Sequence, residues 1–385
     1  MEYDIPKNIK ELQQKVKEFV EKELNPISLQ VEKEAHVPEA IVDKMRRMGL
    51  FGIPIPEAYG GLGLSTIGEV LIYEELTQTN ACFRSQIGTS NGIGSMGILF
   101  DGTEEQKRKY LPRIASGEWT AAFALTEPDA GSDAANISTS AVLEGEHWIV
   151  NGTKLFITNA DVADVFTTIV VTDEEKRARG GCSALIIEKD FAGFSVGPPD
   201  IKMGLKGSQT CELVFKNCRV PKDNVIGGMP MAGKGFNTAM RVLDKGRLTM
   251  GACALGASQK LLDMSLAHVK RKIEGGRSKS RLQATLFELA DMATQIYAAR
   301  QMLYHAAWLR DQGNNVTHEA SMVKLFCTEM ASKIADKAMD IFEDEGYLKQ
   351  TQIEMYLRDV RLFRIFEGTS EIQRLVISRN LLNAK

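Results

Sequence analysis

The chain lacks an excess of one charge, a long apolar run and a leader-like start, and each absence excludes a class of protein. Among its 385 residues, 47 basic side chains are balanced by 50 acidic ones, for a net charge of -3. This balance gives no electrostatic reason to expect nucleic acid or an anionic membrane as a partner. No apolar run is long enough to span a bilayer, and the first residues lack the basic and apolar regions of a secretory signal.

The chain also lacks clustered metal ligands and paired cysteines. Its six cysteines and five histidines are dispersed, without a Cys-x-x-Cys pair. Such cysteines are typical of reduced core residues, so we expect a cytoplasmic protein. Dispersed histidines do not support a metal site or a histidine-based triad. No Gly-x-Gly-x-x-Gly motif joins a predicted strand to a helix, which argues against a Rossmann nucleotide site.

Three compositional zones follow one another along the chain, which is too long for one hydrophobic core to serve all of it. Residues 1–120 carry apolar side chains at three- and four-residue spacing, which predicts helices. Residues 121–232 contain β-rich runs, and Asn151-Gly152 between two of them predicts a hairpin. Residues 233–385 return to four long helical patterns. The sequence therefore predicts an α+β protein with an N-terminal helical domain, a middle antiparallel β domain and a C-terminal four-helix bundle.

The segment at residues 364–374 combines an acid with Gly-Thr-Ser directly before a helical run. The hydroxyl of Thr369 or Ser370 can cap that helix, and Glu371 suits its first turn. Local chemistry alone favours a capping motif in which Glu367 merely lies near a helix end.

Two further segments lie at the start of the predicted β domain. Residues 123–133 form a turn of small, polar, glycine and proline residues, and the backbone N–H groups of such turns can bind a polar ligand. An ordinary interdomain turn explains the same composition. Phe156 and Thr158 are two residues apart on a predicted strand, so they share one face. They can meet a flat ligand there or pack in the core.

Taken together, these segments resemble the acyl-CoA dehydrogenase family over essentially the whole chain. The resemblance rests on five runs in order, namely IPEAYGG (55–61), ALTEPDAGSD (124–133), LFITNA (155–160), DKGR (244–247) and RIFEGTSEIQR (364–374). It implies α,β-desaturation of an acyl-CoA thioester, in which a carboxylate takes the α proton and FAD takes the β hydride. Glu367 matches the position of the base. Such a carboxylate needs a dry pocket that raises its pKa.

The resemblance also implies binding residues for the cofactor and the substrate. The flavin ring is expected against Leu125, Thr126, Phe156 and Thr158. The FAD phosphates are expected near Ser132, Thr369 and Glu371. The acyl-CoA is expected against Ser132, Asp244, Arg247 and Gly368.

Arg84 matches a more specialised position. It lies in a segment where glutaryl-CoA dehydrogenases carry an arginine for the distal carboxylate of the substrate, a task that suits a guanidinium. Those enzymes place a glutamate seven residues earlier, where this chain has Thr77. A substrate contact and a structural ion pair therefore both remain open for Arg84.

Two segments depart from the family pattern. Family members are usually tetramers in which each FAD reaches a neighbouring subunit through Arg-x-Gln-Phe-Gly and Gln-x-x-Gly-Gly-x-Gly. Here the first motif aligns with residues 272–276, which include Lys272 and Glu274. An ungapped alignment of the second places Asp340, Glu343 and Asp344 at the Gln and the first two glycines. Acidic side chains are expected to obstruct and repel the FAD pyrophosphate.

The leading hypothesis is a cytoplasmic FAD-dependent acyl-CoA dehydrogenase of fatty acid or amino acid catabolism. By resemblance it would be a homo-oligomer, a tetramer or dimer, that passes electrons to an electron-transfer flavoprotein. One alternative is a flavin-free or flavin-poor homologue that uses Glu367 for isomerase or lyase chemistry on acyl-CoA. The other is a non-catalytic partner subunit, against which the retained Glu367 argues.

Overall fold

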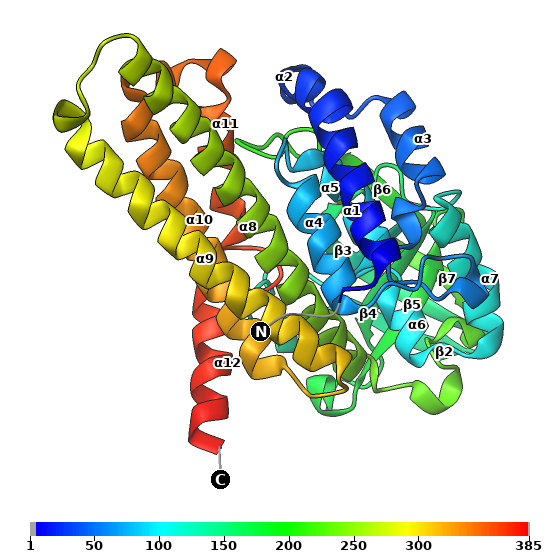
Figure 1. Ribbon diagram of the computed structural model, residues 1–385. Coiled ribbons are helices and arrows are strands. Elements are labelled where there is room, and N and C mark those ends of the chain that lie inside the picture. The colour runs from blue at the N-terminus through cyan, green and yellow to red at the C-terminus, as the bar shows by residue number, and fades with distance from the viewer. Residues whose placement is uncertain (1–4, 384–385) are drawn as a thin grey trace.

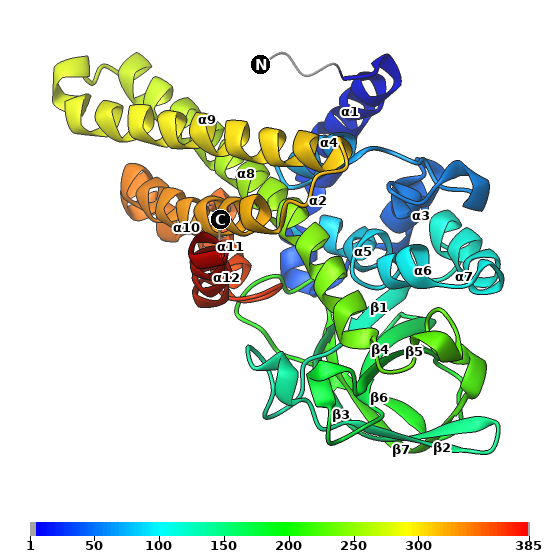
Figure 2. The same cartoon turned by 90° about the horizontal axis from the view of Figure 1, so that it is seen from below.

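The computed structural model describes residues 5–383, and its three parts follow one another along the chain (Figure 1). The first part is helical, the second is a curled β domain, and the third consists of long helices. Figure 2 shows the β domain on one side, with the helices of the other two parts above it. The predicted fold class, helical then β then helical, is confirmed.

The first part builds its helices from the apolar spacing seen in the sequence. Thr103 caps α7, because its side chain and that of Gln106 form a reciprocal capping box. Pro26 lies in the first turn of α2, directly after a π-helical turn (Val20–Leu24) that joins α1 to α2. The helices are α1 (Lys7–Phe19), α2 (Asn25–Glu34), α3 (Glu39–Arg47), α4 (Thr66–Leu76), α5 (Cys82–Asn91), α6 (Met96–Asp101) and α7 (Glu104–Ser116).

The second part is a mostly antiparallel sheet in the order β1-β4-β2-β3-β7-β6, with β5 paired to β4. Strand β1 pairs with β4 in parallel, and one further parallel bridge joins β2 to β4. The long pair β3–β7 forms one wall of the curled sheet (Figure 2). The strands are β1 (Ala121–Ala124), β2 (Ser140–Glu144), β3 (His147–Thr158), β4 (Val165–Val171), β5 (Cys182–Glu188), β6 (Phe194–Pro199) and β7 (Thr210–Pro221).

The hairpin predicted at Asn151-Gly152 is wrong. Strand β3 runs through both residues, and its register with β7 shifts there as in a bulge. A Cβ on Gly152 would lie 2.6 Å from the hydroxyl of Thr139, so glycine serves a close approach at this point. The tight connection between β2 and β3 lies instead at Gly145. A turn and a bulge both exploit the freedom of Asn-Gly, and only pairing with a distant strand separates them.

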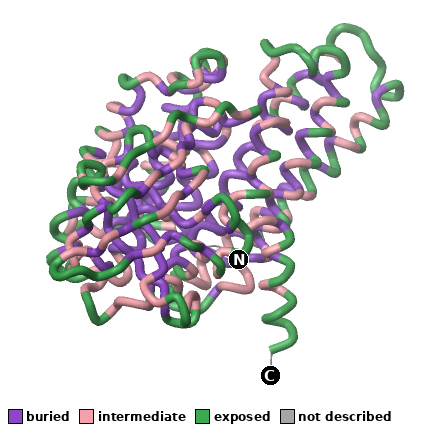
Figure 3. The backbone as a smooth tube through the Cα atoms, turned by 180° about the vertical axis from the view of Figure 1, so that it is seen from behind, coloured by how far each residue is buried: buried purple, intermediate pink, exposed green. Residues whose placement is uncertain are grey.

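The third part contains α8 (Gly235–Glu274), α9 (Gln283–Asp311), α10 (Thr317–Phe342), α11 (Ile353–Phe363) and α12 (Ser370–Asn383). Four of these correspond to the predicted long helices, and α11 is an additional shorter one. Helix α12 projects from the body and is exposed along most of its length (Figure 3). Within residues 5–383, no helix combines the length and the apolar character needed to cross a membrane.

The first and third parts meet where α4 packs on α8. Helix α4 is buried on nearly every side. A Cβ on Gly256 of α8 would lie 2.2 Å from the carbonyl oxygen of Glu74 and 2.3 Å from the hydroxyl of Thr77. The carboxylate of Glu74 in turn accepts hydrogen bonds from Arg300 and Tyr304 on α9. Glycine at position 256 therefore sets the distance between the two helices that carry the residues of the site described below.

We expect Gly256→Ala to lower the free energy of unfolding by about 2 kcal/mol, because the added methyl group overpacks the α4–α8 contact. Denaturant unfolding of the purified protein measures this. Gly131→Ala is the matched control, since a Cβ there meets no atom within 4 Å. Equal stability of the two variants would contradict the proposed close contact.

Candidate active site

Glu367 lies in the turn between α11 and α12, where the backbone is left-handed at two successive residues. The φ angles are +55° at Glu367 and +92° at Gly368, and the first of these is unfavourable for a residue with a side chain. The hydroxyl of Thr369 accepts a hydrogen bond from the N–H of Ile372 at 3.3 Å. The predicted capping role is therefore present, and the strained glutamate lies directly before the capped end.

The carboxylate of Glu367 is directed at helix α8. Its Oε2 atom is buried and has no hydrogen-bond partner. A Cβ on Gly246 would lie 2.2 Å from this oxygen, so a glycine in the middle of the 40-residue helix α8 makes room for the carboxylate. Burial raises the pKa of Glu367 above its ordinary value.

Positive charges from three helices counteract this effect on the pKa of Glu367. They belong to Arg84 on α5, Lys324 on α10 and Arg247 on α8, and each lowers the pKa. Glu69 on α4 raises it. The result is a mostly buried carboxylate whose ionised form is stabilised by cations at a distance. These properties are those required of a general base.

Asp244 and Arg247 form an ion pair one turn apart on α8, at 2.6 Å. Arg247 also donates a hydrogen bond to the hydroxyl of Ser321, and Asp244 accepts one from Thr317. The pair thus joins α8 to the start of α10. The Nε atom of Arg247 is buried and without a partner, which leaves one donor for a ligand.

Arg84 is buried on α5 and has few partners. It donates one hydrogen bond, from Nη2 to the hydroxyl of Thr249 at 3.2 Å, and its guanidinium lies 4.7 Å from the centre of the Tyr73 ring. Its Nε atom has no partner. None of the ion pairs among the described residues involves Arg84, so the alternative of a structural ion pair receives no support.

A second group of predicted residues surrounds a buried ion pair at the edge of the β domain. Lys154 and Glu127 lie 2.7 Å apart, with side chains 0% and 2% exposed. Lys154 also donates a hydrogen bond to the carbonyl of Leu125 at 3.0 Å. Glu127 accepts bonds from Ser138 and the backbone N–H of Thr139. The Lys154–Glu127 pair therefore fixes the turn that contains Leu125 and Thr126.

Phe156 projects from the end of β3 just beyond this turn. Its side chain is 64% exposed and its φ is +59°, within a register shift between β3 and β7. An exposed aromatic ring on strained backbone is costly unless another molecule covers it. Thr158 is half-buried two residues later, whereas Ser132 and Glu371 are exposed on the β domain and on α12.

Of the exposed acids that were expected to repel a pyrophosphate, Glu343 is paired with cations of the same chain. Glu343 keeps a left-handed φ of +55°, as the glycine expected there would. Its carboxylate lies 3.0 Å from Lys272 and 3.4 Å from Arg277, and these cations lower its pKa, Lys272 most strongly. The charge of Glu343 is therefore compensated within the chain. Asp340 and Asp344 are exposed beside it.

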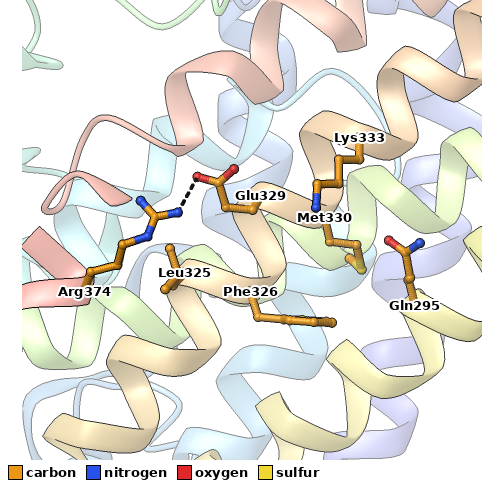
Figure 4. Close-up of a pocket in the computed structure, with 7 residues that line it drawn as sticks. All are labelled: Gln295, Leu325, Phe326, Glu329, Met330, Lys333 and Arg374. Atoms are coloured by element: carbon orange, nitrogen blue, oxygen red, sulfur yellow. Dashed lines mark ion pairs between the residues drawn. The ribbon is translucent and has the colours of Figure 1, made fainter. Parts of the chain in front are cut away.

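A cavity lies elsewhere, between α9, α10 and α12. It measures about 410 Å³ and is lined by Gln295, Leu325, Phe326, Glu329, Met330, Lys333 and Arg374. Figure 4 shows Arg374 directed at Glu329, which also accepts hydrogen bonds from Arg364 and Ser370. None of the predicted site residues lines this cavity, so we assign it no chemistry. Glu329 thereby links Arg364 and Ser370, the two ends of the segment that carries Glu367.

For three residues of the site, the sequence alone predicts no role. Gly246 interrupts a long helical pattern, and this interruption is the signal that marks it. Lys154 is a charged residue inside a strand pattern. Lys324 carries no local signal, because a single lysine on a helix is ordinarily solvated.

Comparisons with known proteins agree along the whole chain. The family models described as acyl-CoA dehydrogenase N-terminal, middle and C-terminal domain match residues 6–118, 122–218 and 233–382. A protein named acyl-CoA dehydrogenase from Bacillus subtilis is 41% identical over 367 residues, which cover 95% of this chain and 96% of that one.

Solved structures show the same likeness. Butyryl-CoA dehydrogenase from Megasphaera elsdenii is 32% identical, with a TM-score of 0.95 and full coverage of both chains. A chain solved in work on the electron transferring flavoprotein of Acidaminococcus fermentans is 38% identical, also with a TM-score of 0.95 and full coverage of both chains.

We expect Lys154→Met to destabilise the protein by about 3 to 5 kcal/mol, because Glu127 is left as a buried charge without its cation. The double variant Lys154→Met/Glu127→Gln should recover most of that loss. Denaturant unfolding of both variants tests this. A double variant that is as unstable as the single one would show that the two side chains do not act as a pair.

Proposed function

Since the chain belongs to the acyl-CoA dehydrogenase family, we propose that Glu367 is the base with which it removes the α proton of an acyl-CoA thioester. As a member of this family the chain is an FAD-dependent oxidoreductase that desaturates acyl-CoA. None of the comparisons favours a flavin-free isomerase or a non-catalytic subunit.

One observation carries the role of Glu367. The buried Oε2 atom has no hydrogen-bond partner, so its lone pairs are free for a proton. Burial raises the pKa of the carboxylate, while Arg84, Lys324 and Arg247 limit the rise. A base needs both properties, since it must be ionised at working pH and still bind a proton.

Removal of the α proton also requires that negative charge on the thioester oxygen be stabilised. The backbone N–H of Glu367 is the proposed donor, as the family resemblance implies. Because the φ of Glu367 lies in the left-handed region, the direction of its backbone N–H relative to its own carboxylate is fixed. Asp244 and Arg247 are proposed to bind the CoA moiety, with Gly368 and Ser132 also against the substrate.

The residues present fit FAD, which supplies the acceptor for the β hydride. The fit rests on the exposed, strained Phe156 and on the turn that Lys154 fixes at Leu125. Leu125, Thr126, Phe156 and Thr158 would hold the ring. Ser132, Thr369 and Glu371 would lie near the phosphates. Because Lys272 and Arg277 compensate the charge of Glu343, repulsion of a neighbour's pyrophosphate is weaker than the sequence suggests.

The proposed partners follow from the family and from the surface. Exposed apolar side chains lie on α9 and α12, where Phe287, Tyr297 and Leu382 are examples; they suit a homo-oligomer. Electron transfer to an electron-transfer flavoprotein is proposed on the family resemblance. The six cysteines are buried and unpaired, which suits the cytoplasm.

Glu367→Gln should lower turnover at least about 100-fold, since the variant cannot accept the α proton. Its absorption spectrum with FAD and its binding of butyryl-CoA should remain those of the parent protein. Glu105→Gln, which changes an exposed carboxylate on α7, is the matched control. Substantial turnover by Glu367→Gln would remove Glu367 from the role of base.

For Arg84 we propose a contact with a carboxylate at the distal end of the acyl group. A buried guanidinium without an ion pair is unfavourable, and the adjacent hydroxyl of Tyr73 is likewise buried and without a partner. Both groups can donate to a carboxylate. The proposed substrate class is therefore a dicarboxylic acyl-CoA.

If this assignment holds, Arg84→Met should reduce kcat/KM for glutaryl-CoA about 100-fold more than for butyryl-CoA, because two charge-assisted hydrogen bonds are lost. Steady-state kinetics with the two substrates measures the ratio. The neutral substrate is the internal control. An equal loss with both would show that Arg84 serves the base or the packing and does not bind a distal acid.

A further inference from the structure

The left-handed segment at Glu367 and Gly368 is held by two donors on one carbonyl oxygen. Lys324 on α10 donates from Nζ to the carbonyl oxygen of Gly368 at 2.7 Å. Gln373 on α12 donates from Nε2 to the same oxygen at 3.0 Å. The strained φ of Glu367 needs such support, because nothing in the local sequence favours it.

Lys324 is unusual as a donor in this position. Its side chain is fully buried, yet none of the ion pairs among residues 5–383 includes it. Burial lowers its pKa to about 8, and the charge of Glu367 opposes this effect. A buried lysine that gives its hydrogen bond to a backbone carbonyl beside the proposed base is expensive to keep, which indicates that its position matters to the site.

In the part of the chain that the structure describes, the other two cations near Glu367 make their hydrogen bonds to side chains and not to the backbone beside the base. Arg84 donates to Thr249, and Arg247 is paired with Asp244. Among these three cations, Lys324 alone donates a hydrogen bond to the backbone next to the base. The titratable and charged groups that act on Glu367 are Arg84 on α5, Lys324 on α10, Glu69 on α4, and both Arg247 and Cys253 on α8. Burial raises the pKa of Cys253 to about 11, so its thiol is neutral at pH 7.

We propose that Lys324 is a positioning residue for the base. By binding the carbonyl of Gly368 it holds the left-handed segment that directs the Glu367 carboxylate at Gly246, and its charge favours the ionised carboxylate. This inference rests on the proposed role of Glu367.

The test is the pH dependence of kcat/KM for butyryl-CoA, measured with FAD-loaded Lys324→Met and Lys324→Gln. Both variants remove a positive charge, so the pKa of Glu367 rises and the acid limb of the profile should move about one pH unit higher. Lys324→Gln retains an N–H donor for the Gly368 carbonyl. Its plateau at high pH should therefore fall less than that of Lys324→Met, for which we expect a loss of about 10- to 100-fold.

Thr328→Val is the matched control on the same helix. The Thr328 side chain is buried, and its hydroxyl donates to the carbonyl of Lys324 at 2.8 Å, so this variant disturbs the core but keeps the ammonium. Its acid limb should coincide with that of the parent protein.

An acid limb that stays in place in folded Lys324→Gln overturns the inference, whether or not Lys324→Met folds. A lowered plateau with an unmoved acid limb would indicate a packing defect and would also overturn the inference. Glu367→Gln separates this from the proposed function: if that variant keeps its turnover, Glu367 is not the base. If it is inactive while the Lys324 variants titrate normally, only the positioning role of Lys324 fails.

Discussion

The close approach of the turn at Glu367 to helix α8 is the constraint on which the site depends. Gly246 is the position on α8 where the carboxylate finds room, since a Cβ there would lie 2.2 Å from Oε2. The approach buries one carboxylate oxygen without a partner and thereby raises its pKa. It also brings the carboxylate within the field of Arg247 on the same helix. The contact between Glu367 and Gly246 therefore determines both how the turn packs on α8 and how far the pKa of the proposed base is raised.

Two buried lysines, one in the β domain and one on α10, each donate a hydrogen bond to a backbone carbonyl near predicted site residues. Lys154 donates to the carbonyl of Leu125, and Lys324 donates to the carbonyl of Gly368. Burial lowers the pKa of each to about 8. They differ in charge balance, since Lys154 has Glu127 as a direct partner. Lys324 has no such partner among the described residues and is affected by the more distant charges of Glu367, Glu329 and Glu371. The first therefore fixes a turn, and the second combines a hydrogen bond with an electrostatic effect on the proposed base.

The altered segments at Lys272 and Glu343 show why charge should be judged in three dimensions. In the sequence, three acids replace Gln and two glycines, which predicts repulsion of a phosphate. In the structure, Glu343 adopts a backbone conformation suited to glycine and pairs with two cations. The charge of one of the three acids is therefore compensated within the chain, which the count of acids does not reveal.

The sequence by itself determined the order of helical, β and helical parts and the capped start of α12, because periodicity and capping are local properties. Glu367 was singled out as the base by the family resemblance, since its local chemistry indicates only a cap. The sequence did not determine whether Asn151-Gly152 forms a turn or a bulge, since the answer lies in pairing with β7. Nor could it single out Lys324, which contacts a carbonyl 44 residues away, or the need for Gly246. Those depend on which helices pack together, and only the tertiary structure decides that, because a long-range contact leaves no trace in the local pattern of residues.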